Sequence, residues 1–382
     1  MRIPFSRPCR TGRELEYIEE CLASSVIAGD GAFTKRCKEI LERIYAGSKV
    51  LLTTSCTHAL EMCSLLLDIG PGDEVLLPSF TFVSTANAVA LRGARPVFVD
   101  VREDTLNIDE SLCEARVTER TKAIFVVHYG GVGAQMEAMR KIADGHGLKL
   151  VEDAAQGLGA TWGGRPLGGI GDLGALSFHE SKNIVCGEGG ALIINRADLV
   201  DRATIIREKG TNRTRFLQGL VDKYTWTDIG SSYLPSDILA AYLCAQLESL
   251  DAVNRRRRAI FDYYLGRLSP LEQELRIRTP RIPAQASPNG HLFYVLLESE
   301  EERNRVIAGM RAAGIMCVFH YVPLHLSPMG ARFGFGPGDL PVTESIAARL
   351  VRLPLFYQMT DEEAEEVVDT LLSVLGEGRT RP

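Results

Sequence analysis

Four short segments of the chain carry polar side chains in settings where they could do chemistry. The first is residues 53–58 (TTSCTH), which follow an apolar run and precede a helical pattern. A helix N-terminus has unpaired backbone N–H groups that can hold a phosphate, and the hydroxyls of Ser55 and Thr57 would add donors. The alternative is an ordinary N-cap by Ser or Thr, which needs no ligand. The segment contains neither a P-loop nor a G-x-G-x-x-G pattern.

The second and third segments would bring a carboxylate and an amine to strand ends. Asp153 comes just after an apolar run, where it could hold the cationic nitrogen of a heterocycle; a helix cap or a solvated turn is the alternative. Lys182 lies in the turn that follows the apolar residues 175–178. Burial lowers the pKa of a lysine, and a neutral amine can form a Schiff base with an aldehyde cofactor. The alternative for Lys182 is an ordinary surface lysine.

The fourth segment is His320-Tyr321-Val322-Pro323-Leu324-His325, whose two histidines could contact the phosphates or hydroxyls of a ligand or simply order a turn. None of the seven histidines shows zinc-binding spacing, so no metal site is expected. The basic run 255–258 lies inside a helical pattern and is interpreted as a solvated helix face. An aromatic ring in residues 80–82 could stack on a planar ligand or pack in the core.

The elements that would position these residues follow from the apolar pattern. Short runs rich in Val, Ile and Leu predict strands over residues 49–53, 74–78, 95–100, 123–127, 148–151, 175–178 and 190–194. Helical patterns separate several of them, at 57–68, 81–91, 136–145 and 199–208. Strands of this composition, spaced by helices, predict an α/β layer with a largely parallel sheet. Ligands bind at the carboxyl ends of the strands in such sheets.

The pattern changes after about residue 248. A helix is predicted over 250–268, a strand over 291–297, a helix over 300–313 and a second strand over 315–319. Thr360-Asp361-Glu362-Glu363 is a capping box that predicts a last helix, followed by a frayed tail from residue 376. We therefore expect a large domain over 1–248 and a smaller α+β domain over 249–382.

Composition limits the function classes. Forty-three basic against 49 acidic residues give a net charge of -6, which disfavours nucleic-acid binding. No apolar run approaches the ~20 residues that span a bilayer, and the start lacks a signal peptide. Nine scattered cysteines without a C-x-x-C pair favour free, mostly buried thiols in a reducing cytoplasm.

The combination of these segments resembles the DegT/DnrJ/EryC1/StrS family of sugar aminotransferases, which are fold type I pyridoxal-phosphate (PLP) enzymes. The resemblance is carried by VEDAAQ at 151–156, SFHESK at 177–182 and GEGG at 187–190. Further similar stretches are 29–34, 72–75, 78–87, 206–213, 223–226 and 320–325. The last three of these, with GSSY at 230–233, look most like the subgroup that aminates TDP-4-oxo-6-deoxyglucose at C4.

The resemblance implies a role for each site residue. Lys182 would form the Schiff base and move protons, and Asp153 would pair with the pyridine nitrogen. Gln156 would reach the phenolic oxygen and Phe82 would stack on the ring. The cofactor phosphate would be bound by Thr57, His58, Ser177 and, from the neighbouring subunit, Ser232. The substrate would be bound by His320, Tyr321 and His325.

The implied reaction is transfer of an amino group from L-glutamate to C4 of a TDP-linked 4-oxo-6-deoxyhexose, in a homodimer. A 3-aminotransferase, a dehydratase (in which histidine replaces the lysine) and a non-catalytic cofactor- or nucleotide-sugar-binding regulator are the alternatives. Two residues depart from the family pattern. Ser232 stands where many members have Asn, and Cys56 replaces a glycine, for which we expect an ordinary backbone conformation.

Overall fold

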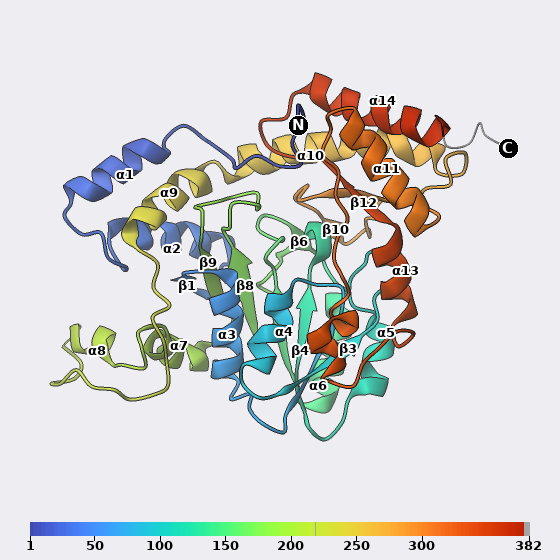
Figure 1. Cartoon of the computed structure of the whole chain (residues 1–382). Helices are drawn as coiled ribbons and strands as arrows, with labels where there is room; N and C mark the ends of the chain where they lie inside the picture. Colours follow the sequence, from blue (N-terminus) through green and yellow to red (C-terminus); the bar gives the residue numbers. More distant parts are fainter. Residues whose placement is uncertain (218, 378–382) are drawn as a thin grey trace.

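The computed structural model of the chain describes residues 1–217 and 219–377. Its centre is a seven-stranded sheet in the order β1-β9-β8-β5-β4-β2-β3 (Figure 1). Strands β8, β5, β4, β2 and β3 are parallel, and β9 runs antiparallel to both of its neighbours. The strands are β1 Lys49–Thr53, β2 Glu74–Pro78, β3 Arg95–Val99, β4 Thr121–Val127, β5 Lys149–Asp153, β8 Leu173–Ser177 and β9 Gly190–Ile194. The prediction of a mostly parallel α/β sheet is confirmed.

Successive residues of each strand pack into two different clusters, one on each face of the sheet. In β4, Ala123 and Phe125 join one cluster, whereas Ile124 and Val126 join the other. The first, the α3 cluster, includes α3 (Cys56–Leu66), α4 (Val83–Ala90) and α7 (Val200–Arg207). The second, the α9 cluster, includes α2 (Ala32–Ile44), α6 (Met136–His146) and α9 (Asp237–Glu248). Burial on both faces explains why the strands read as continuous apolar runs.

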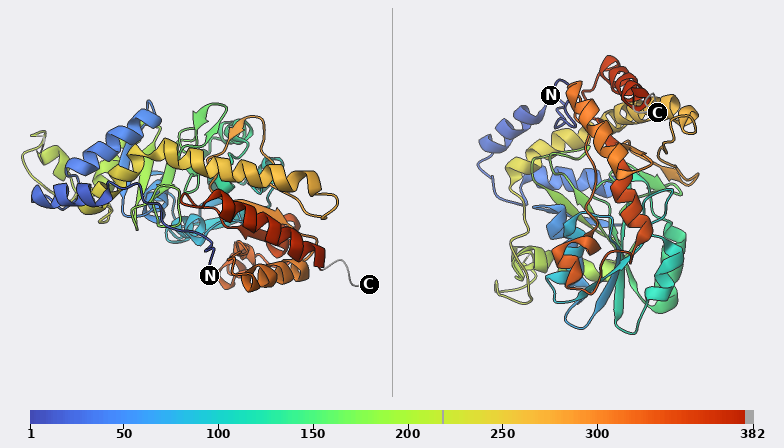
Figure 2. Two further views of the ribbon diagram at one scale, coloured as in Figure 1. Left: turned by 90° about the horizontal axis from the view of Figure 1, so that it is seen from above. Right: turned by 45° about the vertical axis from the view of Figure 1, so that its right-hand side comes forward.

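The C-terminal elements form a third cluster that includes Ile3 from the start of the chain. Figure 2 shows α10, α11 and α14 side by side there, next to the strand pair β11–β12. The helix α10 is shared: Val253 packs in the α9 cluster, and Phe261 packs in the C-terminal cluster. The division into domains at residue 248 stays a prediction. The elements are α10 Leu250–Leu268, α11 Glu300–Ala312, α13 Pro341–Arg349, α14 Asp361–Glu377, β11 Phe293–Leu296 and β12 Leu350–Leu353.

The remaining elements are short or peripheral. They comprise α1 Glu14–Ala23, α5 Glu110–Cys113, α8 Arg213–Leu217, α12 Pro328–Ala331 and the two-residue strands β6 Thr161–Trp162, β7 Arg165–Pro166 and β10 Ala286–Ser287. All nine cysteines are free and buried, as predicted. Within 1–217 and 219–377, no helix is both long and apolar enough to cross a membrane.

In the C-terminal part, the structure confirms the predicted capping box but not the predicted second strand. The capping box is confirmed: the Glu363 N–H donates to Thr360 Oγ1 (3.1 Å), and the Thr360 N–H donates to a Glu363 carboxylate oxygen (3.0 Å). The strand predicted over 315–319 is wrong, because Ile315 pairs with Ile3 whereas Val318 pairs with Arg352, so only isolated bridges form. Of the tail expected to fray, residues 376 and 377 belong to α14, and 378–382 lie outside the described residues.

A buried carboxylate fastens the start of α2 to α9. Asp237 accepts hydrogen bonds from the N–H groups of Phe33 (3.1 Å) and Thr34 (2.8 Å) and from the Thr34 hydroxyl (2.7 Å). Gly31, the residue immediately before α2, leaves room for this carboxylate, since a Cβ at Gly31 would lie 2.3 Å from Asp237 Oδ2.

Gly31→Ala should therefore destabilise the protein by about 2–3 kcal/mol, because Asp237 must move and lose these bonds. The matched control is Gly145→Ala in α6, where a Cβ meets nothing within 4 Å. That change should be neutral or stabilise by up to about 1 kcal/mol. Denaturant unfolding of both variants measures the difference, and equal effects would contradict the assigned contact.

Candidate active site

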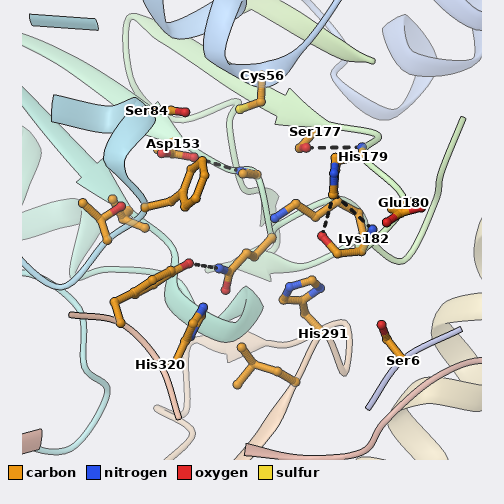
Figure 3. A pocket seen from close by; sticks show the side chains of 18 of the residues that line it. Ser6, Cys56, Ser84, Asp153, Ser177, His179, Glu180, Lys182, His291 and His320 are labelled. Carbon is orange, nitrogen blue, oxygen red and sulfur yellow. Dashed lines mark hydrogen bonds between the residues drawn. The ribbon is translucent and has the colours of Figure 1, made fainter. Parts of the chain in front are cut away.

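A cavity of about 650 Å³ lies where the parallel strands end. Its walls come from the turns after β1, β2, β5 and β8, as the rule for open α/β sheets predicts. The C-terminal part closes it with residues of α10, of β12 and of the segments around residues 291 and 320. Figure 3 shows Asp153, Ser177 and Lys182 together in this cavity, with His291 and His320 on its other side.

The end of β5 directs two consecutive carboxylates to opposite faces of the sheet. Val151 packs in the α3 cluster, so the alternation of the strand turns Asp153 to the same face. There Asp153 accepts hydrogen bonds from Thr85 Oγ1 (2.7 Å) and from the Ala155 N–H (3.1 Å). The side chain is buried apart from a small exposed fraction, and it lines the cavity.

Its neighbour Glu152 points the other way and is fully buried. One of its oxygens lies 2.8 Å from His128 Nε2. The Ala134 N–H donates to Nδ1 of that ring, so Nε2 carries the proton that bonds Glu152. Burial by itself would raise the pKa of Glu152, but hydrogen bonds from His128 and from the N–H groups of Gly168 and Gly171 lower it. This network fixes the end of β5 and hence the position of Asp153.

Lys182 lines the cavity, and its surroundings shift the pKa of its amine. Burial lowers the pKa of its amine, and the nearby Arg352 adds to this effect, whereas Cys56 and Asp153 oppose it. The direction is the one anticipated from the sequence. It increases the fraction of the amine that is neutral and therefore nucleophilic near pH 7.

The partly buried amine should also affect the stability of the protein. An ammonium with a lowered pKa destabilises the folded state at low pH, and this cost disappears as pH rises toward the ordinary value of 10.5. Cofactor-free Lys182→Met should therefore be more stable than the cofactor-free wild type at about pH 7, and the gap should shrink by about pH 9.5. Urea unfolding at both pH values tests this, and a gap that widens with pH would contradict it.

The turn after β1 forms the N-cap that was the simpler expectation from the sequence, and the phosphate-binding role of this turn stays a prediction. The Ser55 hydroxyl caps α3 by accepting from the His58 N–H (3.1 Å), so that N–H already has a partner. Thr57 lines the cavity, and its hydroxyl lies 2.7 Å from that of Ser84. Cys56 begins the helix without a positive φ, as expected. Gly190 packs against this turn, where a Cβ would lie 2.4 Å from the Cys56 nitrogen.

Other predicted residues meet at the opposite wall. Gln156 Nε2 donates to the Tyr321 hydroxyl (3.1 Å), and its Oε1 accepts from the Gly130 N–H (2.6 Å). His320 Nδ1 lies 3.0 Å from the Tyr129 hydroxyl, and burial lowers the pKa of this imidazole. Phe82 also lines the cavity and is 58% exposed, so its ring is available to a planar ligand.

Three predicted residues lie outside the cavity wall: His58, His325 and Ser232. His325 is fully buried, with Nδ1 2.7 Å from Ser79 Oγ and Nε2 3.1 Å from Glu344 Oε1. Both nitrogens thus have protein partners, and His325 is placed to hold two segments together, not to contact a substrate. Ser232 is exposed and pairs with Glu208 in an isolated bridge.

Sequence reasoning missed four parts of the wall. Arg257 was grouped with a solvated helix face, but it is buried and donates to the carbonyls of Gly290 (3.1 Å) and His291 (2.6 Å). Arg257 lies four residues after Val253 and four before Phe261, so helical spacing places it on the same apolar face and could have indicated its burial. The other three parts are His291, Arg352 and residues 5–7. They come from distant segments, and no local sequence pattern indicated that they belong to a site.

Fold and cavity together define an α/β protein in which a lysine of lowered pKa and a carboxylate share one site at the ends of parallel strands. The chain belongs to the DegT/DnrJ/EryC1/StrS aminotransferase family, whose model matches residues 8–372. An uncharacterised protein of Methanocaldococcus jannaschii is 32% identical over 385 residues, which cover 99% of this chain and 98% of that protein.

Solved structures of similar proteins agree with this assignment. The aminotransferase TlmJ of Streptoalloteichus hindustanus is 30% identical, with a TM-score of 0.89 over 99% of this chain and 100% of that one. DesV of S. venezuelae, solved with a ketimine intermediate, is 32% identical, with a TM-score of 0.88 over 98% of both chains. The putative sugar aminotransferase Spr1654 of Streptococcus pneumoniae in its PLP form is 27% identical, with a TM-score of 0.90 over the full length of both chains.

Proposed function

We propose that this protein is a PLP-dependent sugar aminotransferase that transfers the amino group of L-glutamate to C4 of a TDP-linked 4-oxo-6-deoxyhexose. The product is a TDP-4-amino-4,6-dideoxyhexose. The observation that carries the proposal is that Lys182 and Asp153 line one cavity at the carboxyl end of the sheet. Similarity to Spr1654, solved in PLP and pyridoxamine phosphate (PMP) forms, supports the cofactor.

The donor set of the cavity fits that cofactor. Thr57 at the start of α3 and the Ser177 hydroxyl suit its phosphate, and the exposed ring of Phe82 suits its planar ring. The carboxylate of Asp153 suits a protonated pyridine nitrogen, and the amine of Lys182 suits an aldehyde. When bound, PLP supplies an electron sink that stabilises negative charge on the adjacent carbon.

The residues of this chain then have distinct tasks. Asp153 keeps the pyridine nitrogen protonated, because its charge is held in place by Thr85 and by the backbone. Lys182, once neutral, takes and returns the proton of the substrate carbon. Gln156, which hydrogen bonds to Gly130 and Tyr321 hold in place, would reach the phenolic oxygen.

The finer identity of the substrate rests on the resemblance of residues 206–213, 223–226 and 230–233 to the C4-aminating subgroup. His320 and Tyr321, which lie on the wall formed by the C-terminal part, are proposed to contact the sugar. Their side chains pack on Phe80 and Tyr129, which leaves rings and polar atoms in fixed positions.

We also propose that the enzyme is a homodimer in which Ser232 reaches the neighbouring cofactor. The support is an exposed arm around α8 that projects from the body in Figure 1. The arm carries large apolar side chains open to solvent: Leu217, Leu220, Tyr224, Trp226 and Ile229. Monomeric proteins rarely expose such a group of side chains, and a second subunit would cover them.

Borohydride reduction of the holoenzyme, followed by peptide mapping, tests the core of the proposal. A pyridoxyl group is expected on Lys182, with the other lysines of the same map as internal controls. Its appearance on another lysine, or on none, would refute the proposal. A screen of TDP- and UDP-linked 3- and 4-oxo sugars with glutamate, read by mass spectrometry, then decides between C3 amination, C4 amination and loss of a hydroxyl.

A further inference from the structure

Buried side-chain amides connect the residue after Lys182 to the opposite wall of the cavity. Asn183 is buried, and its Nδ2 donates to the Asn289 carbonyl (3.2 Å) and to Asn254 Oδ1 (2.9 Å). Because a backbone carbonyl only accepts hydrogen bonds, Nδ2 must be the atom that faces Asn289. The other end of the amide, Oδ1, is therefore the atom that meets His291.

The orientation of Asn183 decides which ring nitrogen of His291 carries the proton. Nδ1 of His291 lies 2.9 Å from Asn183 Oδ1, which can only accept, so Nδ1 is protonated and Nε2 carries a lone pair. Burial and nearby positive charges, of which Lys182 has the largest effect, lower the pKa of this imidazole well below its ordinary value and keep it neutral. The hydrogen bond fixes the tautomer, and the surroundings fix the charge.

Nε2 of His291 is an acceptor without a partner in the protein. Across residues 1–217 and 219–377, the only side-chain hydrogen bond of His291 is the one through Nδ1. The side chain is partly exposed and lines the cavity, and Figure 3 shows its ring below the side chain of Lys182. With Nδ1 turned to Asn183, Nε2 is the ring nitrogen left to bind a ligand in this cavity.

A neutral acceptor at this place restricts which part of a ligand it can bind. Carboxylate and phosphate oxygens only accept hydrogen bonds at neutral pH, so they gain nothing from Nε2. Apart from its reacting amine, L-glutamate carries only carboxylates, and the pyridine nitrogen of the cofactor is assigned to Asp153. The base of the nucleotide has an N–H group, but the diphosphate separates it from the reacting carbon. The hydroxyl groups of the sugar are the remaining donors.

The proximity of Lys182 selects one of these hydroxyls. The charge of the Lys182 amine acts on the His291 ring, so the two groups lie within direct electrostatic range. The carbon that reacts must lie beside Lys182, and in the proposed substrate this carbon is C4. Of the two carbons next to C4, C3 carries a hydroxyl, whereas C5 carries the methyl group.

We propose that His291 Nε2 accepts a hydrogen bond from the C3 hydroxyl of the nucleotide-linked sugar, an assignment that rests on the proposed function. Asn183 is then a positioning residue, because it holds the proton on Nδ1 and leaves the lone pair on Nε2. The contact would fix the rotation of the sugar ring above Lys182. It would also make the enzyme selective for sugars that keep this hydroxyl.

Calorimetry on the PMP-loaded holoenzyme tests the contact without turnover. The two ligands are TDP-6-deoxyglucose, which has no carbonyl group to react, and its 3-deoxy analogue. Wild type should bind the hydroxylated sugar about 5- to 30-fold more tightly, as expected for one hydrogen bond in a desolvated site. His291→Phe should abolish this preference, and His291→Gln should keep part of it, because the amide oxygen is again an acceptor. The control His146→Phe, at the exposed end of α6, should leave the preference unchanged.

Nitrogen NMR of the holoenzyme with isotope-labelled histidine gives a second readout, in which His291 should be neutral and protonated on Nδ1. A proton on Nε2 would overturn the assignment. So would a hydroxyl preference that is absent from wild type or that survives in His291→Phe. If wild type transfers amino groups without this preference, the contact fails and the proposed function stands. If wild type shows the preference but transfers no amino group, the proposed function fails and the contact stands.

Discussion

Lys182→Ala is expected to lower amino transfer by at least about 10⁴-fold, since it removes both the covalent partner of the cofactor and the group that moves the proton. The fold should persist, because within residues 1–217 and 219–377 no hydrogen bond or ion pair involves this amine, and its desolvation is a cost to the folded state. Single-turnover formation of the amino sugar, together with circular dichroism, measures both effects.

The matched control is Lys141→Ala, which removes an exposed lysine from α6 and should keep full activity. Retention of more than a small fraction of activity by Lys182→Ala would contradict the role of this residue. Global unfolding of the variant would contradict the expectation that the fold does not depend on this amine.

Asp153→Asn should have the second-largest effect. Asparagine has the shape of aspartate and can still accept a hydrogen bond from Thr85 or Ala155, but it carries no charge to keep a pyridine nitrogen protonated. We expect kcat to fall about 10²–10³-fold, by analogy with the loss of one preorganised electrostatic contact to a transition state. Steady-state kinetics with saturating cofactor measure it.

Glu152→Gln provides a matched comparison one residue away. The same change there replaces one carboxylate oxygen by an NH2 donor, although both oxygens of Glu152 accept hydrogen bonds from donors, and it should therefore mainly lower thermal stability. Asp153→Asn should therefore lose turnover, whereas Glu152→Gln should lose stability. If Glu152→Gln lost turnover at unchanged stability, the assignment of a cofactor contact to Asp153 and a structural role to Glu152 would be wrong.

The sheet could be predicted because its strands are buried on both faces and read as continuous apolar runs. Strands β1, β2 and β9 begin and end where the pattern placed them. The segment 315–319 has the same composition but divides its partners between Ile3 and Arg352, which no local pattern reveals. Strand pairing over long separations is set by tertiary packing, so this expectation failed.

The cavity was predictable where its residues follow strands and unpredictable where they do not. Asp153, Ser177 and Lys182 lie at or just after strand ends, and topology alone brings such positions to one edge. Arg352 and Phe5 enter from opposite ends of the chain, and only the folded C-terminal cluster brings them together. His325 has the residue type of a ligand contact, but the structure gives both its nitrogens to Ser79 and Glu344.

The opposite directions of Glu152 and Asp153 restrict how this enzyme can change over evolutionary time. An insertion or deletion of a single codon within the strand would turn each acid to the opposite face, so that Glu152 would no longer face His128 and Asp153 would no longer face the cavity. Homologous enzymes with altered specificity should thus vary in the loops around this strand and keep its length fixed.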